Sequence, residues 1–413
     1  MRIGIVAPPW VAVPPPGYGG TETIIDLVTR GLSDRGHDVR LFTTGDATCP
    51  VQRGHLVSHA LGTERSGDLS LLRHHVSAAY RWLVDQGPLD VIHDHTEWGP
   101  MWQSADIPIV ATLHNAIDDT TRRRWLHYPE NVTVVTISSA HRGYAALLPA
   151  EVIHHGIDTA QFPFGAWRSD HLLFLGRMTP DKGVLPAIEI ARAAGLPLLI
   201  AAKARLPEER EFLEEQVTPL LGGSVRYVGE AQQAEKLRLL ASARALLNPI
   251  QWPEPFGLVM VEALASGTPV ITTPFGAAPE IVTHGRTGFI CRTRAEAAAA
   301  SHAVTGLSRE LCRDVAVRRF DVSVMVTAYE SLFRRVTRES TRSQDRRRRQ
   351  AAGLFARQVL CPECDRPLTA VTRPAATPIC ADCSTRRPDP AALVPSQLAA
   401  QNADPSDQGV VAG

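Results

Sequence analysis

The sequence has no excess of charge of either sign, because its 43 lysine and arginine residues equal its 43 aspartate and glutamate residues. Nucleic acids and anionic membranes attract basic chains, so we expect no specific nucleic-acid partner. The sequence also lacks a run of about 18 apolar residues, the length that a membrane-spanning helix needs. Its start, MRIGIVAPP, has no basic segment followed by an apolar one. We therefore expect a cytoplasmic protein.

Cysteine is scarce, with seven residues in 413. Cys49, Cys291 and Cys312 are scattered and are expected to be reduced, structural thiols. The other four stand as two Cys-x2-Cys pairs: Cys361, Cys364, Cys380 and Cys383. Two such pairs at this spacing predict a zinc-ribbon-like module, in which four thiolates hold a structural Zn²⁺. A pair of disulfides or a degenerate tail is the alternative.

The first part of the chain alternates between apolar strand-like runs and helical stretches. Arg2–Ala7 is typical of a strand buried on both faces. A proline-rich loop follows it, and a helix is expected from Glu22 to about Asp34. Further strands are predicted at DVRLFTT, Leu89–His93, Ile107–Leu113, Val132–Ile137 and Glu151–His154. Strands separated by helices predict a doubly wound parallel sheet.

A second α/β unit is predicted after residues 163–169, with strands at HLLFLG, PLLIAA, SVRYVG, ARALLNP and TPVITT. Arg177 and Lys182 bracket the turn that follows the first of these strands. Ligands of open α/β sheets bind at the carboxyl ends of the strands, and two cations there would neutralise a diphosphate. Exposed cations of this kind also occur as ordinary solvated surface, which is the alternative.

The stretch from Trp252 to Phe289 carries the densest pattern. Seven residues separate Glu254 from Glu262, and Gly257 stands where the chain turns into a helix-like run. Free amides at a helix N-terminus favour an anion such as a phosphate. After the strand TPVITT, a second small-residue turn opens another helix at Glu280. Two helix N-termini beside a short parallel strand predict a nucleotide-binding cleft.

Three segments together resemble the retaining glycosyltransferases of family 4, which have the GT-B fold. They are GRMTPDKG, NPIQWPEPFGLVMVEALASGTPVI and GAAPEIVTHGRTGF. The resemblance covers roughly residues 1–335 and includes the Gly-Gly-Thr-Glu turn and the VIHHGID segment. It implies an α/β protein of two Rossmann-like domains facing a cleft. The second domain would hold a nucleotide-sugar donor, and the first would hold the acceptor.

The resemblance also implies roles for single residues. Arg177 and Lys182 match the diphosphate-binding pair, Glu254 matches the glutamate that contacts donor-sugar hydroxyls, and His114 matches a histidine near the donor sugar. Glu262 matches the glutamate that binds the ribose. The expected donor-binding set is Gly19, Gly20, Phe256, Gly257, Leu258 and Glu262. Taken alone, the glycine turn would more often serve tight packing, and His114 would more often be a satisfied strand-end histidine.

The chain departs from the family pattern at several positions. His154 and His155 precede Gly156 where relatives often have Asn-Gly, and Lys203 stands where many have glycine. His93 and His95 flank Asp94 and could share a face of a strand, but no third metal ligand is evident. We expect an acceptor-side or structural role there rather than a zinc site. The basic run 122–124 beside Trp125 is expected to be a solvated helix face, with an anionic acceptor or a membrane surface as alternatives.

The resemblance implies retention of the anomeric configuration without a catalytic metal. Donors with uridine, guanosine and adenosine occur in such families, and the acceptor could be a sugar, a lipid or a small molecule. Peripheral contact with the inner membrane face is the alternative to a purely cytoplasmic location. Two other functions stay open, a non-catalytic nucleotide-sugar-binding protein and an interaction protein acting through the zinc ribbon. The predicted segments are the acceptor domain 1–165, the donor domain 166–320, a crossing helix 321–338, a basic linker 339–358, the four-cysteine zinc-ribbon-like module 359–387 and a disordered tail 388–413.

Overall fold

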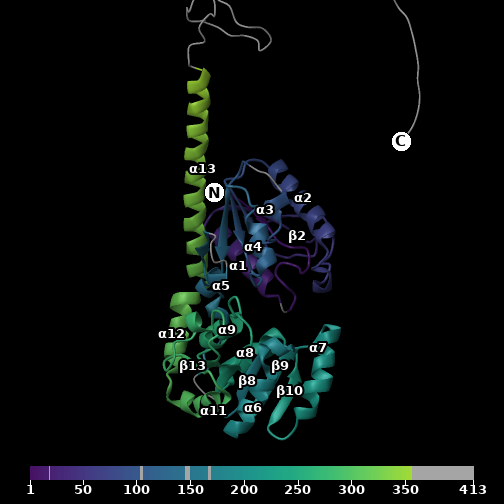
Figure 1. The fold of residues 1–413 in the computed structure, drawn as a ribbon, viewed down its shortest axis with the longest axis vertical. Coiled ribbons are helices and arrows are strands. Elements are labelled where there is room, and N and C mark those ends of the chain that lie inside the picture. Colours follow the sequence, from purple (N-terminus) through teal and green to yellow (C-terminus); the bar gives the residue numbers. More distant parts are fainter. Residues whose placement is uncertain (18, 103–105, 145–148, 166–168, 356–413) are drawn as a thin grey trace, which may run out of the picture. The chain divides into compact units, whose positions relative to one another are not determined.

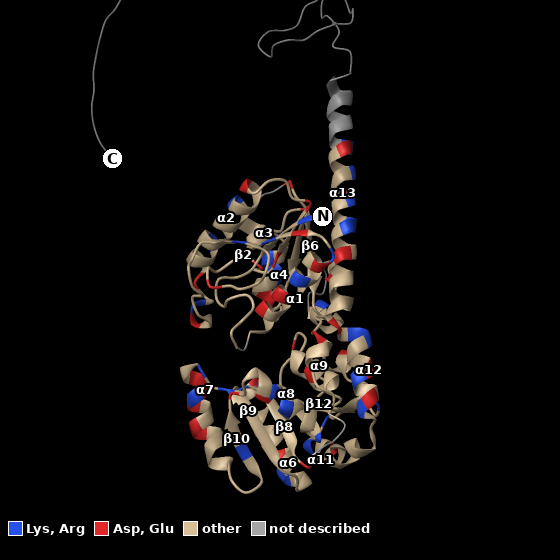
Figure 2. Ribbon diagram, turned by 180° about the vertical axis from the view of Figure 1, so that it is seen from behind, with Lys and Arg blue, Asp and Glu red and all other residues tan. Residues whose placement is uncertain are grey.

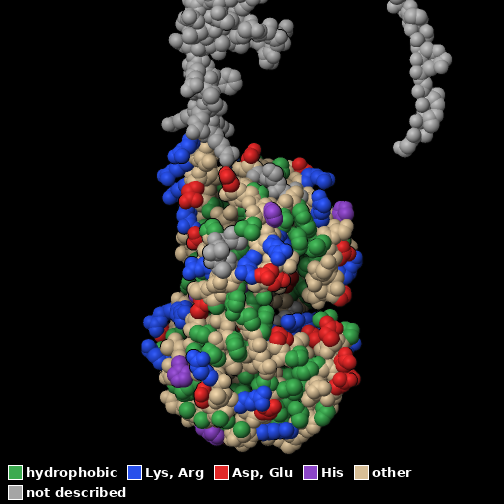
Figure 3. Space-filling view, in the orientation of Figure 1, with side chains coloured by type: hydrophobic (Ala, Val, Ile, Leu, Met, Phe, Trp, Pro, Cys, Tyr) green, Lys and Arg blue, Asp and Glu red, His purple; other side chains and the backbone are tan. Residues whose placement is uncertain are grey.

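The computed structural model of the 413-residue chain describes residues 1–17, 19–102, 106–144, 149–165 and 169–355. The chain divides into two compact units, Met1–Thr341 and Arg342–Gly413, and the first contains both sheets (Figure 1). The described helices include none that combines the length and apolar character required to cross a membrane. Acidic, basic and apolar side chains are interspersed on the face shown in Figure 3.

The first sheet has seven strands in the order β3-β2-β1-β4-β5-β6-β7, and every pairing is parallel. The strands are β1 Arg2–Val6, β2 Asp38–Thr43, β3 Gln52–His55, β4 Val91–Asp94, β5 Ile109–Thr112, β6 Val132–Thr136 and β7 Glu151–Val152. The order reverses between β1 and β4, which is the doubly wound topology expected from the sequence. β3 was not predicted, because its residues, QRGH, lack an apolar pattern.

The second sheet has six parallel strands in the order β10-β9-β8-β11-β12-β13. They are β8 Leu172–Arg177, β9 Leu198–Lys203, β10 Val225–Gly229, β11 Ala245–Asn248, β12 Val270–Thr272 and β13 Gly288–Ile290. Its order reverses between β8 and β11. In open α/β sheets, ligands bind outside the carboxyl ends of the strands at such a reversal.

Helices connect most of the strands in both halves, as parallel pairing favours, and α11, α12 and α13 follow the last strand. They are α1 Gly20–Asp34, α2 Leu69–Asp85, α3 Gly99–Trp102, α4 Asp119–Trp125, α5 Ser139–Tyr144, α6 Val184–Ala194, α7 Pro207–Phe212, α8 Gln233–Ser242, α9 Leu258–Ala265, α10 Ala278–Ile281, α11 Arg294–Ala303, α12 Arg309–Phe320 and α13 Val322–Phe355. α1 begins two residues before the predicted start and ends where predicted.

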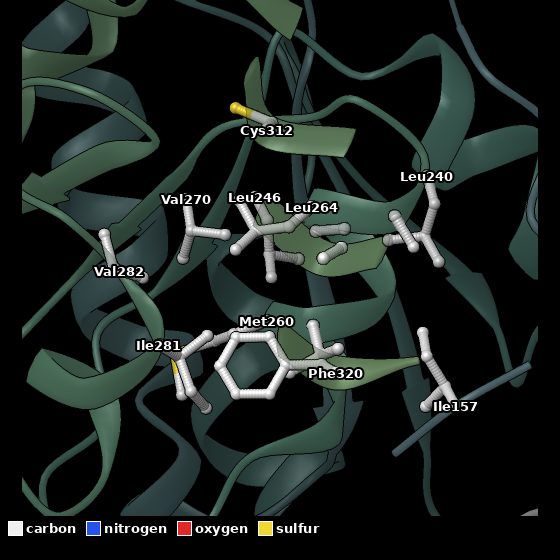
Figure 4. Close-up of a cluster of buried hydrophobic side chains, with 14 of the residues drawn as sticks. Ile157, Leu240, Leu246, Met260, Leu264, Val270, Ile281, Val282, Cys312 and Phe320 are labelled. Atoms are coloured by element: carbon white, nitrogen blue, oxygen red, sulfur yellow. The ribbon is translucent and has the colours of Figure 1, made fainter. Parts of the chain in front are cut away.

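The core under the Glu254–Glu262 stretch is built from strands and helices of the second sheet. Leu246 and Val270, on neighbouring strands, pack with Met260 and Leu264 of α9 and with Phe320 of α12 (Figure 4). These side chains are all at most 1% exposed. Because interiors are close-packed, α9 has little freedom to shift. This packing fixes the start of α9 relative to the strand ends.

The last helix, α13, packs on the first sheet. Tyr329 and Phe333 are buried in the core of that sheet, and the hydroxyl groups of Tyr329 and Thr112 lie 3.0 Å apart. The helix was expected to end near Arg338 and to give way to a linker, but it continues to Phe355. The segment has no proline and is rich in arginine and glutamine, both good helix formers. Figure 2 shows acidic and basic residues along it.

The cysteine predictions divide into two groups. Cys49, Cys291 and Cys312 are free and buried, as expected. Cys361, Cys364, Cys380 and Cys383 lie outside the described residues, so the zinc-ribbon hypothesis stays a prediction, as do the segments 359–387 and 388–413.

Candidate functional site

The two expected diphosphate ligands lie at the carboxyl end of β8. Arg177 is the last residue of that strand and pairs in register with Lys203 at the end of β9. Among the described residues, the half-buried side chain of Arg177 makes no ion pair. Lys182 ends the short 3₁₀ turn Pro180–Lys182. The amide of Gln251 donates to the carbonyl oxygen of Asp181 at 2.9 Å and so holds this turn against the chain that follows β11.

Lys182 and Glu254, 72 residues apart in sequence, form an ion pair. The Nε1 atom of Trp252 also donates to Oε2 of Glu254 at 2.8 Å, and the Lys182 ammonium lies 4.8 Å from the centre of the Trp252 ring. Both charged side chains are only 15% exposed. The structure therefore brings the expected diphosphate cation and the expected sugar-binding carboxylate together. A donor would have to share or replace this contact.

The turn at Gly276 and Ala277 packs against the backbone of Glu254. The amide of Ala277 donates to the carbonyl oxygen of Glu254 at 3.0 Å. Gly276 has a positive φ of 55°, and a Cβ atom added there would lie 2.1 Å from the same oxygen. Only glycine allows this approach without displacement. The small-residue turn predicted from GAAPE therefore positions Glu254.

Glu262 lies on α9 and pairs with Lys236 of α8, with 2.9 Å between Nζ and Oε1. Gly257 precedes α9 in the left-handed region with φ 92°, and no side chain caps the helix. Phe256 is 2% exposed and belongs to the core. The arrangement presents uncapped backbone amides at the start of α9 and a carboxylate further along it, as the sequence predicted.

The Gly-Gly turn of the first sheet meets the start of α9. A Cβ atom added to Gly20, the first residue of α1, would lie 3.5 Å from Cδ1 of Leu258. Gly19 is the N-cap residue and has an extended backbone, with φ −176°. Its position is crowded, since a Cβ atom there would lie 2.8 Å from Cβ of Pro15. Close packing thus accounts for the glycine at 19, the alternative weighed from the sequence.

His114 follows β5 and lies among other histidine rings. Its Nε2 atom is 2.8 Å from Nδ1 of His95, and its ring stacks on His155 with 5.2 Å between ring centres. His93 and His95 have ring centres 4.0 Å apart, as expected for two residues on one face of a strand. The described residues contain no group of three histidine, cysteine or acidic side chains suited to a metal.

Burial keeps these histidines neutral. It lowers the pKa of His93 and of His114 to about 3, helped in each case by a neighbouring histidine. The pKa values of His95 and His155 also fall well below their ordinary value, chiefly because of burial. An array of neutral imidazoles offers hydrogen bonds without charge. These neutral histidines therefore add no positive charge to that of Arg177 and Lys182, the expected diphosphate ligands.

Glu280, at the end of the GAAPE turn, contacts the first sheet. Its carboxylate accepts hydrogen bonds from the amides of Ser139 and Ala140, at 2.9 and 2.7 Å, and lies 2.9 Å from Nε2 of His154. Burial alone would raise the pKa of Glu280, but the bonds from His154 and the two amides outweigh it and lower the pKa to about 2. His154, in the segment before Gly156, therefore pairs with this carboxylate.

Several residues of this site were missed at the sequence level. Lys236 pairs with Glu262, Trp252 donates to Glu254, and Glu97 accepts from the amides of His114 and Asn115. Trp252 and Glu97 lie beside residues that were singled out, so proximity in sequence was a usable signal for them. Lys236 carries no such signal, because only the packing of α8 on α9 brings it near.

A hollow of about 200 Å³ is lined by residues of α6 and α11 and by the segments at the ends of β11 and β12. Its lining includes Gln251, Thr273, Phe275 and Cys291. None of the expected site residues lines it, so we place the candidate site at the charged pairs and not in this hollow.

Comparisons with known proteins agree with this geometry. Residues 18–161 match the family model described as Glycosyltransferase Family 4, and residues 166–311 match Glycosyl transferases group 1. A phosphatidyl-myo-inositol mannosyltransferase of Mycobacterium leprae is 27% identical over 387 residues, covering 83% of this chain and 99% of the relative. A glycogen synthase of Mycobacterium tuberculosis is 30% identical over 289 residues, covering 63% of this chain and 65% of the relative.

Among solved structures, the glycosyltransferase AviGT4 of avilamycin A biosynthesis superposes with a TM-score of 0.63 at 26% identity. The match covers 82% of this chain and 98% of AviGT4. The sequence relatives, the two family models and the paired Rossmann-like sheets therefore agree. The chain belongs to the family 4, group 1 glycosyltransferases and has their GT-B fold.

Proposed function

We propose that this protein transfers a hexose from a nucleotide-sugar donor to an acceptor hydroxyl, with retention of the anomeric configuration and without a catalytic metal. The observation that carries the proposal is the meeting of Lys182 with Glu254 at the strand ends where Arg177 lies. A cation that we assign to the diphosphate thus pairs with a carboxylate that we assign to the sugar hydroxyls, which supports the proposal. Family membership supports the same reaction.

The donor would bind mainly to the domain that we assign to residues 166–320. Arg177, Lys182 and the amides at the start of α9 would hold the diphosphate. Glu254 would accept hydrogen bonds from the sugar, and Glu262 from the ribose. Binding would draw Lys182 towards the diphosphate and the two carboxylates towards donor hydroxyl groups, so both ion pairs would be shared or replaced. Gly20 would lie beside the phosphates, because a Cβ atom added to it would lie 3.5 Å from Leu258 at the start of α9.

The chemistry follows from stabilisation of the leaving group. The bond between the anomeric carbon and the diphosphate oxygen breaks, and negative charge grows on the diphosphate. Arg177 and Lys182 would meet that charge, and preorganised charge of this kind contributes most in the transition state. The acceptor oxygen forms the new bond on the face that the leaving group vacates. Its proton passes to the departing phosphate, so no side-chain base is required.

The acceptor would bind to residues 1–165, near His114. One relative is named for action on phosphatidyl-myo-inositol and another for glycogen synthesis, so lipid and sugar acceptors both occur among similar proteins. For this chain we propose a donor of the UDP, GDP or ADP class and leave the acceptor as a sugar, a lipid or a small molecule. A lipid acceptor would bring the protein to the inner membrane face.

For the tail, we propose a structural Zn²⁺ held by Cys361, Cys364, Cys380 and Cys383, on the strength of their spacing alone. Zinc analysis of the purified protein tests this proposal. We expect one zinc ion per chain, and loss of that ion when Cys361 and Cys364 are both replaced by serine. A chain that retains no zinc without chelator would contradict it.

Two experiments separate transfer from its alternatives. Wild-type protein is incubated with UDP-glucose, GDP-mannose and ADP-glucose, and release of the nucleoside diphosphate is measured with and without chelator. Release of one nucleotide that survives the chelator supports a metal-independent transferase. Binding of a donor without any release, across a panel of sugar and lipid acceptors, would favour a non-catalytic binding protein. A partner captured by wild-type protein but not by the Cys361, Cys364 double serine variant would favour an interaction protein.

A further inference from the structure

The backbone at Glu97 is strained. Its φ is 63°, and it is the one non-glycine residue with positive φ in the part of the chain that the structure describes. Such a conformation costs roughly 1–3 kcal/mol and persists where the surroundings enforce it, often at functional sites. Glu97 is 8% exposed. A buried residue strained in this way is expected to hold a neighbouring segment in place.

The carboxylate of Glu97 holds the loop that begins with His114. Its Oε1 atom accepts hydrogen bonds from the amide of His114 at 3.2 Å, from the amide of Asn115 at 3.1 Å and from Nδ2 of Asn115 at 3.1 Å. The hydroxyl of Tyr128 donates to the carbonyl oxygen of Glu97. The strained residue therefore fixes the backbone of His114.

The ring of His114 is held separately, by His95. Nδ1 of His95 and Nε2 of His114 lie 2.8 Å apart, and His95 is 3% exposed. The remaining nitrogens, Nε2 of His95 and Nδ1 of His114, are buried and have no hydrogen-bond partner among the described residues. Each neutral ring carries one N–H, so the direction of the shared bond decides which of these two nitrogens bears a proton.

The two possible directions differ in what they leave unsatisfied. If His114 donates, an N–H group is left without an acceptor on His95, deep in the fold. If His95 donates, His95 keeps only a bare acceptor nitrogen, and the unpaired N–H lies on His114. Each direction therefore leaves one N–H and one acceptor nitrogen without a partner among the described residues, so the pair by itself does not decide the direction. His95 is 3% exposed, whereas His114 is only partly buried and is the residue that we assign to the donor sugar. A ligand oxygen would more readily meet an N–H on His114, which requires His95 to donate.

We propose that His95 is a positioning residue for His114, donating from Nδ1 to Nε2 of His114 so that the Nδ1–H group of His114 is the donor offered to a substrate hydroxyl. This inference rests on the proposed function, since it assigns the ligand oxygen to the sugar of the donor. The segment His95–Glu97 then positions His114 as a whole. His95 sets the ring of His114, and Glu97 sets its backbone.

The first test needs no substrate. Full-length protein labelled with ¹⁵N-histidine is observed by long-range ¹H–¹⁵N NMR at pH 7.5, and the signals of His114 are assigned by their loss in His114→Gln. We expect a neutral ring protonated at Nδ1 in wild type and in His95→Asn, because the Asn amide group can replace the Nδ1 donor. In His95→Leu we expect a mixture of tautomers. A wild-type His114 protonated at Nε2, or signals unchanged in His95→Leu, would overturn the proposal.

The second test measures release of nucleoside diphosphate from whichever of UDP-glucose, GDP-mannose and ADP-glucose the wild type consumes. His95→Leu should lose about tenfold or more in kcat/KM, the size expected when one hydrogen bond is lost. His95→Asn should recover most of that loss. Affinity for the free nucleoside diphosphate should be unchanged in both variants, because the contact is to the sugar.

The two tests separate this inference from the function on which it rests. Equal activity of His95→Leu and His95→Asn, whether high or low, would contradict the positioning role. If the wild type consumes none of the three donors, the proposed function fails, and the tautomer of His114 alone decides the inference.

Discussion

Ser138 donates a hydrogen bond of 2.7 Å from its hydroxyl to the carbonyl oxygen of Pro255. The contact joins residues 137–138, which follow β6, to the segment between Glu254 and α9. Glu280 reinforces the same junction, because it accepts from the amides of Ser139 and Ala140. The donor motif is therefore tied to the first sheet through one helix start, and the following predictions concern this junction and the site beside it.

Replacing Glu280 by glutamine should destabilise the protein near neutral pH. The variant keeps the shape but loses the charge that accepts three hydrogen bonds, which costs about 1–3 kcal/mol. Because the pKa of Glu280 in the folded protein is about 2, below its ordinary value of 4.5, its contribution is present above pH 4.5 and is lost as the pH falls towards 2. The stability difference between the two proteins should be constant from pH 8 to 5 and narrow below 4.5. Equal urea midpoints at pH 7 would contradict this.

Gly276→Ala should disrupt the site by more than the backbone strain of an alanine at positive φ would explain. The added Cβ atom would clash with the backbone of Glu254, so we expect loss of donor binding as well as lower stability. Gly285→Ala is the matched control, because Gly285 also has a positive φ, of 73°, but nothing lies within 4 Å of the position that its added methyl group would take. It should cost only about 1–2 kcal/mol of strain and leave donor binding intact. Similar donor affinity in the two variants would argue against the support given to Glu254.

His75 should make the stability depend on pH. It is 1% exposed, and its Nε2 lies 2.9 Å from the carbonyl oxygen of Ala7. Burial lowers its pKa to about 4. Below about pH 6.5 the unfolded chain therefore takes up a proton at His75 that the folded protein does not, and the free energy of unfolding falls. Between pH 7 and 5.5, the free energy of unfolding should fall by about 1 kcal/mol less in His75→Leu than in wild type.

Urea unfolding of wild type, His75→Leu and His74→Leu at both pH values checks this prediction. His74 is the neighbouring, exposed histidine on α2, and its replacement should leave the pH dependence as it is in wild type. A pH dependence of His75→Leu that equals the wild-type dependence would refute the assignment.

Lys182→Met and Lys236→Met should separate turnover from nucleotide binding. Lys182 is assigned to the diphosphate, where charge grows in the transition state, so its loss should lower kcat by about 10²-fold or more. Lys236 pairs with Glu262, which we assign to the ribose, so its loss should affect chiefly the donor KM. Steady-state release of nucleoside diphosphate measures both. If Lys182→Met changed only KM, the proposed role of Lys182 would be wrong.

Many residues of the proposed site could be predicted from the sequence because the patterns that mark them are local. Glycines at 257 and 276, two glutamates at a fixed spacing and strand ends after apolar runs are visible without knowing the fold. Pairings between distant elements are not local: Lys236 meets Glu262 only because α8 packs beside α9, and Glu97 meets His114 only because β4 and β5 are neighbours. β3 was missed because a short polar edge strand has no apolar pattern. The length of α13 was missed because an arginine-rich segment suits a solvated helix as well as a linker.

Binding of nucleotide sugars to wild type and to Glu262→Ala, followed by ligand-observed NMR in chelator, tests the central claim most directly. A second chain ending near residue 340 controls for any effect of chelator on the cysteine-rich tail. The account predicts that at least one of UDP-glucose, GDP-mannose and ADP-glucose binds both wild-type chains and that Glu262→Ala abolishes that binding. Failure of every donor to bind either wild-type chain would contradict it.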